Sequence, residues 1–446
     1  MDKMKRMLFA VVVGLGALAS TAGAQQDRIR IELNMGQQRP RLAAPDFHAA
    51  NADPQTAPLN TAFNETLWSD LDNAGIFDMV ARSFYPLKTP GTPNELQASV
   101  WSNPPPNAGV LTFGNLGVNG GKVDVQGWLF DVKNAGSPAI LGKEYREDAT
   151  VDNARLIAHR FANEIIARLG AGIPGIAESK IYFISTRSGA KEVWMMDYDG
   201  ANQKQLTHHG GIALSPQVSP DNSRVAFSGL SKDSWQIMMY SMDLGRLVSF
   251  PRFGGDNYSR AWSSDGTKIA FASTMGQGTS GIFVADASGA GAKRLTSGHS
   301  DVSPVFNPKT NGQIAWVSGR SGLPQIYIMD SDGSNVQRVT DQGYAVSPCW
   351  SPNGLLLAFS WNRKYGPGLP GGQDIYLMDI VSKQFVQLTH DAGTNDFPSW
   401  SPDGRHLVFE STRSGSAQVW SMLADGTHQQ QLTRSAKNTQ PNWSSK

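Results

Sequence analysis

A short motif recurs through the second half of the chain and constrains its fold more than any other feature. Its fullest copies read Trp350-Ser351-Pro352-Asn353-Gly354 and Trp400-Ser401-Pro402-Asp403-Gly404. Three successive intervals between copies are 44 residues long and the last two are 50 and 43, with copies starting at Val218, Trp262, Phe306, Trp350, Trp400 and Trp443. A fixed period of this length predicts a repeat architecture.

Each repeat contains four short strand-like segments. We call the segment that ends in the motif the anchor strand. In the third repeat unit it is followed by apolar runs at residues 268–271 and 281–286 and by a last segment, 294–296, that closes on Leu-Thr. Asp-Gly pairs between such runs favour two-residue hairpin turns, because both positions tolerate a positive φ. Four antiparallel strands in about 40–45 residues predict one blade of a β-propeller.

The two ends of the repeat region predict how the ring closes. Residues 180–185, 192–197 and 203–207 are strand-like but have no anchor strand before them, whereas residues 440–444 form an anchor strand with no partner after it. Joining the two completes a first blade, so the sequence predicts six blades.

The anchor strands carry a proline two residues before most copies of the motif. Since proline cannot donate to a strand ladder, each anchor strand should be an edge strand, which we expect to line the central channel. Arg260 replaces this proline in one repeat and should bring a guanidinium near the channel mouth.

The first part of the chain follows a different pattern. Residues 1–24 have a basic start, an apolar core and a small-residue end, which predicts a secretory signal cleaved between Ala24 and Gln25. Predicted strands and two predicted helices, at 62–73 and 151–169, make residues 25–170 a small α/β domain, joined by a hinge at 171–177 to the propeller at 178–446. The predicted fold class is mainly β: a six-bladed β-propeller preceded by a small α/β domain.

Composition narrows the classes of function. The net charge is +1 and 17% of residues are charged, without a basic stripe, which argues against nucleic-acid binding. The apolar core of the signal is too short to span a bilayer, so no membrane span is expected after cleavage. The single cysteine, Cys349, lies in an anchor strand and is expected to pack there.

Motifs for catalysis or metal binding are missing from the sequence. The eight histidines show no HExxH spacing, no Gly-x-Ser-x-Gly elbow occurs, and the glycine-rich stretches lack a following Lys-Ser/Thr. The motif tryptophans recur at one point of every repeat, which indicates packing between blades. We therefore expect no enzyme activity, no cofactor and no metal.

The candidate binding face is the propeller mouth, formed by the segments just before the anchor strands. These segments differ from blade to blade while the strands repeat, and variation on a repeated scaffold is where binding specificity usually lies. The candidate partner-binding residues there are His209, Asp256, Asn257, Arg260, Asp301, Tyr344, Asn395, Asp396, Asn438 and Thr439.

The combination of a cleaved signal, a small α/β domain and a propeller closed by a C-terminal Pro-x-Trp-Ser resembles the TolB family, the periplasmic component of Tol–Pal systems. The stretches LDNAGIF at 71–77, AHRFANEI at 158–165 and KIYFIS at 180–185 are also similar to that family. The likeness covers residues 25–446.

The resemblance implies a periplasmic, non-enzymatic, monomeric adaptor that supports envelope integrity and constriction at cell division. Its propeller mouth would bind the Pal lipoprotein, and its mature N-terminal strand would bind the C-terminal domain of TolA. The residues that match this strand are Gln25, Gln26, Asp27, Arg28, Ile29, Arg30, Ile31, Glu32 and Leu33.

A second hypothesis is an exported propeller enzyme or glycan-binding module that acts through the central channel. Such a protein would need a pair of catalytic carboxylates or a bound metal ion. The sequence offers Asp256, Asp301 and Asp396 for that role.

Overall fold

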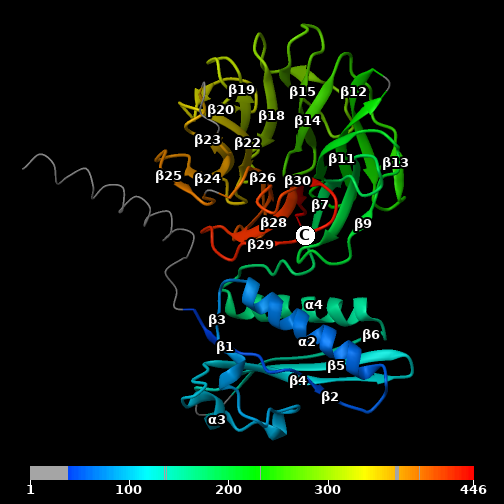
Figure 1. The fold of residues 1–446 in the computed structure, drawn as a ribbon, viewed down its shortest axis with the longest axis vertical. Coiled ribbons are helices and arrows are strands. Elements are labelled where there is room, and N and C mark those ends of the chain that lie inside the picture. Colours follow the sequence, from blue (N-terminus) through cyan, green and yellow to red (C-terminus); the bar gives the residue numbers. More distant parts are fainter. Residues whose placement is uncertain are drawn as a thin grey trace, which may run out of the picture.

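The computed structural model describes residues 39–445, apart from 135, 137, 232, 367–370 and 391. Figure 1 shows a two-layer α/β part beside a ring of β-sheets, with two long helices lying between the sheet of the first part and the propeller. The predicted signal, its cleavage site at Ala24 and Gln25, and the predicted N-terminal strand through Leu33 lie outside the described residues.

The N-terminal part is a mixed six-stranded sheet covered by two parallel helices. The sheet order is β3-β1-β4-β5-β6, with β2 pairing β4. Phe63, Phe161 and Leu129 are fully buried between the layers. The elements are β1 (Arg41–Ala43), β2 (His48–Ala49), α2 (Thr56–Asn73), β3 (Asp78–Met79), η1 (Arg82–Phe84), η2 (Pro93–Glu95), α3 (Ala98–Ser102), β4 (Val110–Asn119), β5 (Lys122–Asp131), β6 (Ala139–Asp148) and α4 (Val151–Leu169).

The helices form where local chemistry favours them. Thr150 caps α4 by accepting a hydrogen bond from the backbone N of Asn153 at 3.2 Å, as expected from the sequence. Helix α2 begins at Thr56, six residues earlier than predicted, because Pro58 lies in the first turn, where a missing N–H costs no helical hydrogen bond. Among the described residues, none of the helices has the length and apolar character needed to cross a membrane.

The C-terminal part confirms the six-bladed propeller. Each blade is a four-stranded antiparallel sheet with the anchor strand at one edge, and in blade one the last strand of the chain pairs with β7. Blades one to six contain, in order, β30 (Asn438–Trp443), β7 (Lys180–Ser185), β8 (Glu192–Asp197) and β9 (Lys204–Gln205); β10 (Ala213–Val218), β11 (Arg224–Ser231), β12 (Ser234–Ser241) and β13 (Arg246–Val248); β14 (Asn257–Trp262), β15 (Lys268–Ser273), β16 (Gly281–Asp286) and β17 (Lys293–Arg294); β18 (Asp301–Phe306), β19 (Gln313–Ser318), β20 (Gln325–Asp330) and β21 (Gln337–Arg338); β22 (Tyr344–Trp350), β23 (Leu356–Asn362), β24 (Asp374–Asp379) and β25 (Phe385–Gln387); β26 (Asn395–Trp400), β27 (His406–Ser411), β28 (Gln418–Leu423) and β29 (Gln430–Gln431).

The repeated motif is explained by the turn that it builds. In blade six the hydroxyl of Ser401 accepts a hydrogen bond from the backbone N of His406 at 3.0 Å and donates to the carboxylate of Asp403. The carboxylate also accepts the backbone N of Arg405 at 2.9 Å, and Gly404 adopts a φ of +67° that favours glycine. Ser219, Ser263 and Ser351 make the same backbone contact in other blades. The motif therefore closes the turn between the first two strands of a blade.

The anchor strands share a bulge at their prolines. In five of them the residue before proline has a φ between 50° and 54°, and the register with the next strand shifts there. These residues are Ser215, Ser303, Ser347, Phe397 and Gln440. In blade three, where Arg260 replaces proline, the register also shifts between Tyr258 and Arg260. The bulge lets each proline lie in an edge strand without a lost ladder bond.

Candidate functional site

The anchor strands line a central channel that has two different ends. At the end formed by the motif turns, residues from all six anchor strands enclose about 370 Å³. Trp350, Trp400 and Trp443 line it while remaining 4–6% exposed, and Trp400 packs with residues of blades five and six, as expected for packing between blades. The mouth lies at the opposite end, where the anchor strands begin.

Four of the predicted mouth residues have side chains without exposed surface. Asn257, Asp301, Asn395 and Asn438 each start an anchor strand and are 0% exposed. The amide of Asn395 donates to Asp374 of blade five at 3.1 Å, and the amide of Asn438 donates to Gln418 of blade six at 2.8 Å. Asn395 and Asn438 therefore tie their blades to the preceding ones, and none of the four buried side chains forms the outer surface of the mouth.

Arginines complete this framework in three blades. Arg187, Arg320 and Arg413 follow the second strand of their blades and donate to Asn438, Asp301 and Asn395, respectively, at 3.0–3.3 Å. Each guanidinium also lies over an aromatic ring of its own blade, 4.7–5.2 Å from the ring centre. The sequence analysis did not single out these arginines, although a Thr/Gly-Arg-Ser-Gly stretch in three repeats was the signal that could have revealed them.

The other predicted mouth residues differ in their exposure. Tyr344 is half-buried, and its ring lies 5.4 Å from that of Tyr365, which is 48% exposed. Thr439 is half-buried in β30. His209 stacks on Phe227 with its side chain only 9% exposed. Arg260 lies in β14 opposite Phe271, and its side chain is outside the described part.

The three carboxylates proposed for catalysis are engaged in different ways. Asp301 is buried against Arg320, and Asp256 accepts the backbone N of Trp235 at 2.9 Å. Asp396 accepts the hydroxyl of Ser360 and the backbone N of Phe397, both at 2.6 Å, and burial raises the pKa of its carboxyl. Each acid is thus bonded to a neighbour in the propeller framework.

Glu410 is a mouth residue that the sequence analysis missed. It lies opposite Asp396 across β26 and β27, and its carboxylate accepts the backbone N of Gln440 at 3.1 Å. Burial raises the pKa of Glu410 to about 7. The equivalent position is Ile, Ser, Ala or Val in the other blades. A glutamate at a position that is otherwise apolar or small could therefore have been identified from the sequence.

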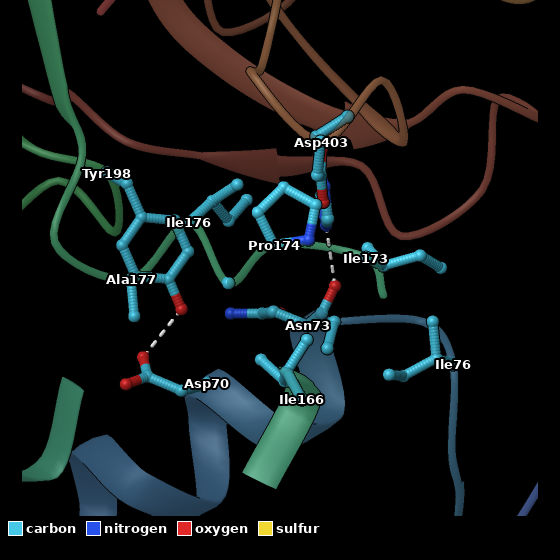
Figure 2. A pocket seen from close by; sticks show the side chains of 13 residues that line it. Asp70, Asn73, Ile76, Ile166, Ile173, Pro174, Ile176, Ala177, Tyr198 and Asp403 are labelled. Atoms are coloured by element: carbon cyan, nitrogen blue, oxygen red, sulfur yellow. Dashed lines mark hydrogen bonds and ion pairs between the residues drawn. The ribbon is translucent and has the colours of Figure 1, made fainter. Parts of the chain in front are cut away.

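The N-terminal part contacts the turn side of the propeller, at the opposite end of the anchor strands from the mouth. Figure 2 shows Tyr198 of blade one pointing to Asp70 of α2, with 2.5 Å between the phenol and carboxylate oxygens. His159 of α4 approaches the other oxygen of Asp70 at 2.7 Å. Arg155 of α4 pairs with Asp199 of blade one. A gap of about 10 Å³ remains between the parts.

His406 of blade six bridges the two parts through both ring nitrogens. Nε2 lies 2.7 Å from the carbonyl oxygen of Asn73, and Nδ1 lies 3.1 Å from a carboxylate oxygen of Asp403. Both partners can only accept, so both nitrogens must carry a proton. Burial lowers the pKa of His406, but the Asp403 carboxylate and the Asn73 carbonyl outweigh it and hold the pKa above its usual range.

One group of potential metal ligands occurs among the described residues. Ligand atoms of His159, Asp197 and Asp199 lie within 4.8 Å of one another. Both carboxylates already have cationic partners, since Lys180 contacts Asp197 at 2.6 Å and Arg155 pairs with Asp199. The group therefore fits a network of ion pairs, and we assign no metal to it.

Comparison with known proteins establishes the family. The model of the TolB β-propeller domain matches residues 168–366 and 340–446, which is more than half of the chain. The chain belongs to the TolB family. Its relatives include the TolB homolog of Chlorobium chlorochromatii, 35% identical over 211 residues, and the Tol-Pal system protein TolB of Desulfosudis oleivorans, 32% identical over 296 residues.

The extent of these matches differs between sequence and structure. The chain spans 45% of the length of the Chlorobium TolB relative and 65% of the Desulfosudis one, and the matches cover 46% and 66% of this chain. The crystal structure of TolB from Acinetobacter baumannii is similar with a TM-score of 0.75 and 22% identity, over 92% of this chain and 97% of that one. The structural likeness supports the TolB fold across both parts of the chain.

Proposed function

We propose that the chain is the TolB component of a Tol–Pal envelope system and acts as a periplasmic protein-binding adaptor without enzyme activity. The observation that carries the proposal is membership of the TolB family, whose relatives include named Tol-Pal system proteins. In this role the protein supports envelope integrity and constriction during cell division. Secretion by the predicted signal at residues 1–24 would deliver it to the periplasm.

Two partner sites follow from this role. The propeller mouth would bind a Pal-like lipoprotein, and the mature N-terminal segment from Gln25 to Leu33 would bind the C-terminal domain of TolA. The arrangement of the parts favours a mouth site, because the contacts with the N-terminal part are made at residues 198–199 and 405–406, on the turn side. The division into residues 25–170, 171–177 and 178–446 stays a prediction.

An adaptor role also accounts for the engaged carboxylates. Asp256, Asp301 and Asp396 hold backbone groups, a hydroxyl or a guanidinium of the propeller itself. A catalytic pair would instead need two carboxyl groups facing a common substrate position. The alternative of an exported enzyme or glycan-binding module is therefore less well supported.

Calorimetric titration of residues 25–446 with the soluble domain of the Pal-like lipoprotein from the same organism tests the proposal. We expect a one-to-one heat of binding that persists when residues 25–33 are deleted. In Tyr365→Ala the free energy of binding should weaken by about 1–3 kcal/mol, as for an exposed aromatic at an interface. Deleting a whole mouth loop would be a poor test, because Asn395 ties blades five and six together. A well-folded protein that gives no heat would contradict the proposal.

A further inference from the structure

The strand directions define which loops share the mouth. In blade six, β26 begins at Asn395, opposite Ser411 at the end of β27, and Ser411 in turn pairs with Gln418 at the start of β28. The loop before each anchor strand and the turn between the second and third strands of each blade therefore open on the same side. The same order of strands holds in all six sheets.

Exposed cations outnumber exposed acids on these loops. Among the described residues, the exposed acids there are Asp233 and Asp341. Three exposed histidines, His208, His299 and His390, lie on the same loops. We call the exposed cations the basic rim: Lys191, Arg252, Arg363, Lys364, Arg434 and Lys437.

The opposite side of the propeller shows no such excess. Its exposed turn residues include the acids Asp221, Asp243, Asp265, Asp286 and Asp332 and the cations Arg224, Arg246, Lys268, Lys293, Lys309 and Lys383. The net charge of the whole chain is only +1. The positive charge of the mouth is therefore a property of this face and not of a generally basic protein.

The rim charges are available for a partner. No member of the basic rim forms an ion pair with another described residue. Arg320, by contrast, is paired with Asp301 in the propeller framework. Arg363 lies over Trp361 and Phe385, at 4.9 and 4.7 Å from the ring centres, so its guanidinium is held in place before binding. The backbone of Lys437 is fixed by two hydrogen bonds with Thr186, at 3.1 and 3.2 Å.

We propose that the basic rim recognises an acidic surface of the protein that docks on the propeller mouth. This inference rests on the proposed function and adds the chemistry of the partner's contact surface. The exposed ring of Tyr365 favours a protein over a simple polyanion, because aromatic side chains next to arginine are typical of protein interfaces. Separate cations around a ring favour a folded acidic face that reaches several blades at once.

Charge complementarity of this kind acts mainly on the rate of association and weakens with salt. The test uses the full mature chain and the soluble domain of the Pal-like lipoprotein at 50 and 300 mM NaCl. We expect the affinity to fall about tenfold or more between the two salt concentrations, chiefly through slower association. The double variant Arg434→Glu/Lys437→Glu should weaken binding by about tenfold or more at low salt.

A matched control carries the same change of charge on the other side of the propeller. Lys268→Glu/Lys293→Glu should leave the affinity within about twofold of the wild-type value, since both residues lie far from the mouth along their blade. Circular dichroism melting of each variant checks that these exposed changes leave the fold intact.

The outcomes separate this inference from the function on which it rests. No binding by the wild-type chain at either salt concentration would overturn the proposed function. If the affinity changed neither with salt concentration nor in the rim variants, the acidic-surface inference alone would be overturned. The same would follow if the rim variants lost affinity for poly-glutamate or polyphosphate but kept their affinity for the lipoprotein domain.

Discussion

At the scale of single residues, Glu410 is a side chain whose buried surroundings disfavour its ionised form. Burial raises its pKa to about 7, whereas a glutamate in an unfolded chain ionises near 4.5. The folded protein therefore binds the proton more tightly than the unfolded one. The cost of ionising Glu410 is absent below about pH 4.5, grows as the pH rises, and is complete above about pH 7.

We therefore predict that Glu410→Gln stabilises the protein at alkaline pH. A neutral amide can still accept the backbone N of Gln440 while avoiding the buried charge. The gain should be about 1–3 kcal/mol at pH 8 and close to zero at pH 4, measured by urea unfolding. Glu144→Gln, a change at an exposed glutamate of β6, should change stability by less than about 0.5 kcal/mol at both pH values. Equal stabilities of wild type and Glu410→Gln at pH 8 would contradict the assignment.

At the scale of elements, the anchor strand of blade six has a structural role at both of its ends. Its motif end closes a turn, and its first side chain reaches the preceding blade, as Asn395 does with Asp374. We predict that Asn395→Ala lowers the free energy of unfolding by about 1–3 kcal/mol, because Asp374 and Arg413, both half-buried, each lose one hydrogen-bond partner. Chemical denaturation measures this loss.

The neighbouring residue provides the control for this prediction. Thr394 has an exposed side chain, and its backbone bonds with Thr412 do not depend on that side chain. Thr394→Ala should therefore change stability by less than about 0.5 kcal/mol. If Asn395→Ala weakened partner binding without a loss of stability, Asn395 would be a contact residue after all.

The anchor strands also show what the sequence could and could not predict. The period of the motif reports chain topology, so six blades, edge strands and the capped helix α4 followed from it and from local signals such as Thr150. The burial of Asn257 and Asp301 could not be predicted from the sequence, because a polar residue in a variable segment is expected to be exposed to solvent. Asn257 bonds Gln236 of the preceding blade and Asp301 bonds Arg320 of its own blade, and each partner lies more than 15 residues away along the chain. The mouth was thus predictable as a region, but its framework and its surface were not distinguishable.

At the scale of the whole molecule, the two parts meet at a cluster of buried titratable groups. Asp403 and Arg405 of blade six lie beside His406, and Asp70, His159 and Tyr198 form a second group across the same interface. Arg405 also donates to the carbonyl oxygen of Gly75 at 3.0 Å, next to the bond between His406 and Asn73. The last turn of α2 is thus held to the propeller by two cationic side chains.

This geometry predicts that the interface loosens as the pH rises. The pKa of His406 is raised, so its contribution to stability is complete below about pH 6.5 and is lost as the pH rises through the higher folded value. The pKa of Asp403 is lowered despite its burial, because His406 and the hydrogen bonds to its carboxylate favour the charged form, so Asp403 stays ionised over this range. Hydrogen exchange in residues 70–75 and 171–177, corrected for its intrinsic pH dependence, should be faster at pH 8.5 than at pH 6.

Substitution of the histidine separates its proton from other effects of pH. In His406→Gln the amide can still donate to Asn73 but carries no titrating proton, so the difference in exchange between pH 6 and 8.5 should disappear. His208→Gln, which changes an exposed histidine at the mouth, should keep the wild-type difference. If the pH dependence were unchanged in His406→Gln, the responsible group would be His159, which lies 2.7 Å from Asp70 on the same face of the N-terminal part. Either result identifies the proton that couples the position of α2 to the propeller.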